Sequence, residues 1–164
     1  LFSYTTLFRS LLQVDSGFYL PLDEDFLPQG TFNSVEKTNF DFSHSTCVGN
    51  ILKSDDSQIV LAGGIDHEFL VSSSLKPVVC CEEPTSGRVL DIYTSEPAVH
   101  VYTGNFLESS LSDKRGVVFQ KYSGIAFETQ HFTDSVHHKN FPSVLLKPGQ
   151  QYFSETKYCF SVKS

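Results

Sequence analysis

The 164-residue sequence has no tryptophan, no methionine and few basic residues. Twelve Lys and Arg residues stand against 19 Asp and Glu residues, which gives a formal net charge of −7, and the basic residues form no cluster. Nucleic acids and anionic membranes are met by clustered basic side chains, so we expect neither as a partner. The sequence also lacks a run of about 18 apolar residues, the length that a membrane-spanning helix needs.

Cysteine is scarce, and no two cysteines have the C-x2-C spacing that favours a zinc site. Cys80 and Cys81 are adjacent in a strand-like run, so their side chains point to opposite faces and one of them is expected to be a small core residue. This usage favours a reduced, cytoplasmic compartment. His131, His137 and His138 give little support to a metal site, because adjacent histidines on a strand diverge.

Aromatic residues are abundant, with 15 Phe and 7 Tyr, and such side chains pack well on strands. Short alternating runs recur between Gly- and Pro-containing turns, which predicts an all-β fold, a large antiparallel β-sandwich. A chain of 164 residues is one domain or part of one, since such sandwiches commonly need roughly 200–250 residues. The expected strands are Val35–Phe42, Gln58–Leu61, Phe69–Ser73, Val78–Glu82, Arg88–Thr94, Ala98–Thr103, Val117–Gln120, Ile125–Gln130, Val144–Leu146 and Tyr152–Val162.

The strand around Glu128 has the clearest signature of a site. Alternation places Ile125 and Phe127 on one face, which we expect to be the core face. Glu128 shares the other face with Gly124 and Ala126. A carboxylate in a row cleared of bulky neighbours has room for a ligand above it. By alternation alone, a glutamate on a solvated face beside two incidental small residues is the more typical interpretation.

Three segments, in this order along the chain, resemble the aldose 1-epimerases, the galactose mutarotase family. They are Gly63-Gly-Ile-Asp66-His67-Glu-Phe69, Pro97-Ala-Val-His100-Val-Tyr-Thr-Gly-Asn-Phe106, and Gly124-Ile-Ala-Phe-Glu128-Thr-Gln-His-Phe-Thr-Asp134-Ser with the following Asn140-Phe-Pro-Ser and Leu146-Lys-Pro-Gly149. The resemblance runs from about residue 14 to the end and is to the carboxyl-terminal half of the family's domain. It implies that residues 11–164 are an incomplete part of one mutarotase-like β-sandwich.

The resemblance also implies roles for three residues. Glu128 matches the family's catalytic base, and Asp66 matches a residue that accepts hydrogen bonds from sugar hydroxyls. By its position alone, an Asp after Gly63-Gly64 is more typical of turn capping. His100 stands where many members carry a glutamine that hydrogen-bonds the sugar. A neutral imidazole can still donate and accept a hydrogen bond, but the pH profile is expected to differ.

The implied reaction interconverts the α and β anomers of an aldose such as galactose or glucose. A base removes the proton of the anomeric hydroxyl and an acid protonates the ring oxygen, which opens the ring. Nothing is oxidised, so no cofactor and no metal are expected. The family's acid is a histidine in the amino-terminal half, where a second histidine and an arginine bind the sugar. None has a match here, and the surroundings of His44 differ, so we expect the chain alone to be inactive.

Two other functions stay open at this point. One is a non-catalytic carbohydrate-binding β-sandwich in which Asp66, His100 and aromatic rings hold a sugar. The other is a structural β-module in a larger assembly. The sequence favours neither galactose nor glucose and leaves the oligomeric state open.

Residues 1–10 are set apart from the rest of the chain. They resemble the translation of a sequencing-adapter oligonucleotide with one residue changed. We expect them to be a non-native artefact that replaces part of a truncated reading frame, the alternative being an ordinary amino-terminal strand.

Overall fold

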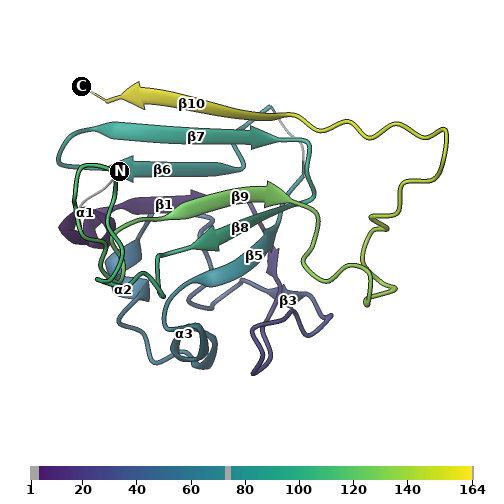
Figure 1. Ribbon diagram of the computed structural model, residues 1–164, viewed down its shortest axis with the longest axis horizontal. Helices are drawn as coiled ribbons and strands as arrows, with labels where there is room; N and C mark the ends of the chain where they lie inside the picture. Colours follow the sequence, from purple (N-terminus) through teal and green to yellow (C-terminus); the bar gives the residue numbers. More distant parts are fainter. Residues whose placement is uncertain (1–3, 73–74, 164) are drawn as a thin grey trace.

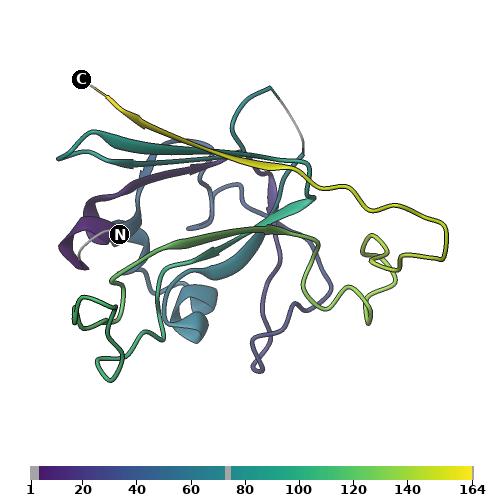
Figure 2. The same ribbon diagram turned by 45° about the horizontal axis from the view of Figure 1, so that its top comes forward.

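The computed structural model describes residues 4–72 and 75–163, which form two five-stranded sheets stacked as a sandwich (Figures 1 and 2). The first sheet has the order β10 (Thr156–Val162), β7 (Arg88–Thr94), β6 (Val79–Glu83), β1 (Leu11–Val14) and β4 (Thr46–Cys47). The second has the order β3 (Asn33–Ser34), β2 (Phe18–Tyr19), β5 (Asp66–Leu70), β8 (Ala98–Tyr102) and β9 (Ala126–Gln130). All pairings between these strands are antiparallel, which confirms the predicted fold class.

The core lies between the two sheets. Leu12, Val79 and Ile92 of the first sheet and Phe69 and Val99 of the second are completely or almost completely buried in one cluster. Burial of such side chains is the main force that holds the layers together, at about 25 cal/mol per Å² of apolar surface. Among the described residues, no helix is long and apolar enough to cross a membrane.

Three short helices accompany the sheets: α1 (Tyr4–Arg9), α2 (Val48–Ile51) and α3 (Ser57–Ala62). Helix α3 corrects the prediction of a strand over Gln58–Leu61. The Asp56 side chain caps its first turn by accepting from the backbone N–H groups of Gln58 and Ile59, and Gly63 ends it in a left-handed conformation. A cap at the start and a left-handed glycine at the end are typical of a helix. Together they outweigh the strand preference of the β-branched residues that lie between Asp56 and Gly63.

Three other predicted strands are also wrong. Val35–Phe42 forms turns, although Phe40 and Phe42 are buried. In Val117–Gln120 only one isolated bridge forms, between Ser112 and Val118. Val144–Leu146 lies in the long excursion between β9 and β10, seen at the right of Figure 1, and its side chains are exposed. A short apolar run does not form a strand where it has no neighbouring edge to pair with.

The remaining predicted strands are present, with ends that are shifted by up to four residues. Arg88–Thr94 is found with its predicted bounds as β7, while β9 begins one residue later than expected and β10 four residues later. The strand predicted over Phe69–Ser73 is β5, which ends at Leu70, and Ser73 lies outside the described residues. Cys81 is the core residue of the adjacent cysteine pair, and burial raises the pKa of its thiol to about 12. All four cysteines are free.

The amino-terminal residues form a helix and not the strand considered as an alternative. Leu7 of α1 is completely buried in the main core cluster. Residues 1–3 lie outside the described part of the chain. The foreign origin of residues 1–10 stays a prediction.

The edge strand β10 exposes apolar side chains. Tyr158 is directly opposite Ile92 and Phe160 directly opposite Leu90, so they point to the core side of the sheet. They are nevertheless 48% and 79% exposed.

Candidate active site

The entry of β5 is fixed by a glycine that no other residue can replace without strain. Gly64 has a φ of 149°, and a Cβ atom there would lie 2.2 Å from the Asn105 Oδ1 atom. The Asn105 side-chain amide donates to the carbonyl oxygens of Ala62 and Ile65, at 3.0 and 2.9 Å. The turn is thus tied to the start of the strand, which sets the position of Asp66.

The strand register brings the three predicted site residues onto one face of the second sheet. His100 on β8 is directly opposite Glu128 on β9, and Asp66 on β5 is directly opposite Tyr102 on β8. Residues that are directly opposite share a face, as do residues two apart on one strand. Asp66 and His100 are in direct contact, with 2.8 Å between Asp66 Oδ1 and His100 Nε2. Glu128 is exposed, while Ile125 and Phe127 pack against the core as predicted.

The electrostatic surroundings of His100 favour its protonated form. Partial burial of the ring lowers its pKa, but the hydrogen bond and negative charge of Asp66 raise it, with further contributions from the charges of Glu68 and Glu128. The net result is a pKa above the ordinary value for histidine.

Sequence reasoning missed Glu68, a third acidic residue on this face. Its side chain is 2% exposed and directly opposite His100 in the β5–β8 ladder. The carboxylate accepts hydrogen bonds from the Thr133 backbone N–H at 3.0 Å, from Thr133 Oγ1 at 2.7 Å and from Gln130 Nε2 at 2.6 Å. The available signal was its spacing of two residues from Asp66 in a strand.

His67, between these two acids in the sequence, points the other way into the core. Its Nδ1 accepts from the Asp66 backbone N–H at 3.1 Å and its Nε2 lies 3.2 Å from Gln58 Oε1, which suits a neutral ring with its proton on Nε2. Tyr19 and Phe40 pack against it. Burial lowers its pKa to about 3. His67 is therefore a core residue.

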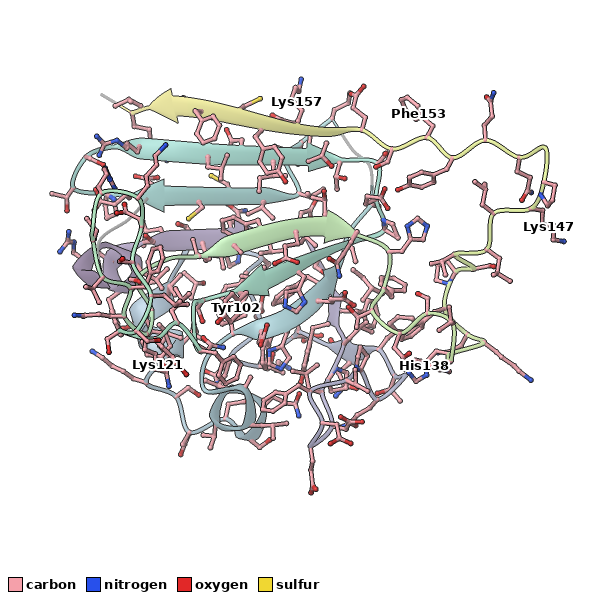
Figure 3. All side chains as sticks on the ribbon, in the orientation of Figure 1. Tyr102, Lys121, His138, Lys147, Phe153 and Lys157 are labelled. Carbon is pink, nitrogen blue, oxygen red and sulfur yellow. The ribbon has the colours of Figure 1, made fainter. Side chains whose placement is uncertain are left out.

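Aromatic rings and a small hollow border the acidic row. Tyr102, labelled on β8 in Figure 3, accepts a hydrogen bond from the Phe106 backbone N–H and stacks on the Phe106 ring, which meets Phe26 edge to face. Beside His100 lies a hollow of about 30 Å³, enough for a water-sized group. Its lining residues are Leu20, Leu22, Phe26, Pro28, Glu68, His100 and Thr133.

The three histidines considered as a metal cluster from the sequence pair with other carboxylates. His131 Nδ1 contacts Glu96 Oε2 at 2.8 Å, and His137 and His138 both contact Asp134. Within residues 4–72 and 75–163, no group of three or more His, Cys, Asp and Glu side chains is arranged to hold a metal ion.

Comparison with known proteins places the chain in a family. The family model described as aldose 1-epimerase matches residues 2–159. The chain belongs to the aldose 1-epimerase family. The match begins well before residue 14, where the sequence motifs placed the start of the resemblance.

Its relatives include galactose mutarotases and further aldose 1-epimerases. The chain is 41% identical to galactose mutarotase from Mus musculus over 146 residues, which cover 88% of this chain and 41% of the mouse protein. It is 32% identical to aldose 1-epimerase from Haemophilus influenzae, over 91% of this chain and 44% of that protein. The aldose epimerase homologue from C. elegans superposes with a TM-score of 0.83 at 25% identity, covering 97% of this chain and 47% of that structure. This aldose 1-epimerase chain thus spans less than half the length of these relatives.

Proposed function

We propose that this chain carries the base and part of the sugar site of an aldose 1-epimerase that interconverts the α and β anomers of hexoses such as galactose and glucose. The observation that supports it is the row of Asp66, His100 and Glu128 across three neighbouring strands, on a face bordered by aromatic rings. Family membership supports the same reaction.

In this proposal Glu128 is the base. Its exposed carboxylate takes the proton from the anomeric hydroxyl, and the ring opens when the ring oxygen is protonated. Asp66 and His100, joined by their hydrogen bond, hold sugar hydroxyls beside the base. Rotation about C1–C2 and reclosure give the other anomer. The reaction transfers protons only and uses no cofactor.

The proposed division of the chain follows the sequence motifs. Residues 11–164 are proposed to be the carboxyl-terminal part of one β-sandwich domain, acting on a small aldose in the cytoplasm. The motif of the family's acid histidine has no match in this sequence. We therefore propose that the 164-residue chain alone accelerates mutarotation little, because one member of the acid–base pair is missing.

Polarimetry on freshly dissolved α-D-galactose and α-D-glucose tests the function. The chain is compared with a chimera that joins residues 11–164 to the part of mouse galactose mutarotase that this chain does not match. We expect the chimera to be active and its Glu128→Gln variant to lose about 10²–10⁴-fold of its rate, the usual value of general acid–base assistance. Glu36→Gln, at an exposed glutamate, is the matched control.

Two results would contradict the proposal. Full activity of the Glu128→Gln chimera would show that another group is the base. A chimera that binds galactose without accelerating mutarotation would favour the carbohydrate-binding alternative, which the absence of the acid motif keeps open.

A further inference from the structure

His100 is enclosed by acidic side chains from both neighbouring strands. On β5, Asp66 contacts it at 2.8 Å and Glu68 is directly opposite. On β9, Glu128 is directly opposite. Directly opposite side chains in an antiparallel pair have Cβ atoms about 4.5–5.5 Å apart, so all three carboxylates lie within strong electrostatic reach of one imidazole.

Glu68 differs from the other two acids because it is buried and fixed. Three donor groups on Thr133 and Gln130 hold its carboxylate, and Glu68 is only 2% exposed. A buried carboxylate is costly unless it has hydrogen-bond donors and an opposite charge nearby. The donors are present, and the neighbouring ring of His100 is the group that can supply the charge.

In the described part of the chain, the other elements around His100 bring no positive charge that would offset these carboxylates. The segment that lines the small hollow contributes the apolar side chains of Leu20, Leu22 and Phe26, together with Pro28. His67, on the far face of β5, is neutral because of its burial. Among the described residues, the charged groups that face His100 are thus Asp66 and Glu68 from β5 and Glu128 from β9.

We propose that Glu68, fixed by Thr133 and Gln130, is a positioning residue that keeps His100 as an imidazolium in the sugar site. The part of this inference that concerns sugar rests on the proposed function. Nε2–H of His100 is directed to Asp66. In a neutral ring Nδ1 would then accept a hydrogen bond, whereas in the imidazolium it donates one. His100 therefore offers the sugar an N–H donor, and the sugar oxygen that meets it is an acceptor.

Titration of His100 by NMR in the ¹⁵N-histidine-labelled 164-residue chain tests the role of Glu68 without any sugar. We expect a midpoint above about 6.5, the ordinary histidine value, in the unmodified chain. Glu68→Gln should lower it by about 0.5–1 pH unit, the effect of removing one nearby charge at a partly screened site. Glu96→Gln is the matched control, because it neutralises a carboxylate that pairs with a different imidazole, His131, also at 2.8 Å.

The outcomes are distinct. A His100 midpoint at or below the ordinary value, or one that Glu68→Gln leaves unchanged, overturns the inference. If the Glu68→Gln chain does not fold, Thr133→Val takes its place. It removes the Oγ1–H donor and so loosens the Glu68 carboxylate. In the Thr133→Val variant, a fall of the His100 midpoint that is smaller than the one expected for Glu68→Gln supports the inference. An unchanged midpoint overturns it.

Calorimetric titration of the 164-residue chain with D-galactose between pH 5.5 and 8.5 tests the sugar contact. The affinity should fall about 3- to 10-fold as pH rises through the His100 midpoint, because a charged donor makes the stronger hydrogen bond. Glu68→Gln should move this transition to lower pH, and Glu96→Gln should leave it in place. Galactose binding that does not depend on pH overturns this inference alone. Absence of galactose binding at every pH, with His100 still coupled to Glu68, counts against the proposed function instead.

Discussion

The two faces of the second sheet each carry a histidine, and the two histidines have opposite environments. His67 on the inner face is buried among aromatic rings, and burial lowers its pKa to about 3. His100 on the outer face is only partly buried, and its carboxylate neighbours raise its pKa. One strand position separates Asp66 from His67, and that step changes the environment from acidic to apolar. The comparison shows that the face, and not the residue type, decides whether a histidine serves the core or a site.

The largest expected effect concerns the inner face. Phe69→Ala should lower the free energy of unfolding by about 3–5 kcal/mol, because Phe69 is completely buried and the variant leaves a cavity between the sheets. Urea denaturation measures the change. Leu75→Ala, at a fully exposed side chain, is the control and should be nearly neutral. A Phe69→Ala chain as stable as the control would mean that the sheets do not share this core.

His67 should make folding sensitive to acid. Its folded-state pKa of about 3 lies below the ordinary value of about 6.5, so between these pH values the unfolded chain binds a proton that the folded chain does not. Stability should therefore fall with decreasing pH in this window, by up to about 1.4 kcal/mol per pH unit. Urea denaturation at pH 7, 6, 5 and 4 measures the slope. His67→Gln should flatten it, and an equally steep slope in that variant would assign the effect to other groups.

On the outer face, Asp66→Asn should change titration far more than stability. Loss of the Asp66 charge should lower the His100 pKa by about 1 pH unit, because this carboxylate makes the direct hydrogen bond. The raised pKa of His100 contributes stability below about pH 6.5, and this contribution is lost as pH rises through the folded-state value. NMR titration of the histidines measures the shift. An unchanged His100 midpoint would contradict the pairing.

The smallest effect on stability is expected for Glu128→Gln. Because Glu128 is exposed, the free energy of unfolding should change by less than about 0.5 kcal/mol. Urea denaturation beside the Phe69→Ala chain gives the contrast between the two faces. A loss of several kcal/mol would make Glu128 a structural residue and weaken its assignment as the base.

The sequence predicted the features that depend on local alternation. The bounds of β7 and the core-facing side chains of β9 follow from a period of two. Helix α3 differs from the predicted strand although Asp56 and Gly63 at its ends are strong local signals, because a short apolar run has no period that separates a strand from a helix. The excursion before β10 could not be assigned from composition, since pairing depends on an available neighbouring edge.

The site was only partly predictable for a different reason. Motif resemblance predicted Asp66, His100 and Glu128 as site residues, but which residue is opposite which depends on strand register, a non-local property. The role proposed for Glu68 depends on its position opposite His100 on the next strand and on its contacts with Thr133 beyond β9. Those partners lie 32 and 65 positions away in the sequence.

The most direct test of the central claim, that the outer face of the second sheet holds the sugar, is an NMR titration of the ¹⁵N-labelled chain with D-galactose. We expect the largest shifts at Asp66, His100, Glu128 and Thr133, small shifts at His67 and Phe69 on the inner face, and none with sorbitol at the same concentration. Shifts centred on His131 and Tyr152, or equal shifts with both compounds, would contradict the claim.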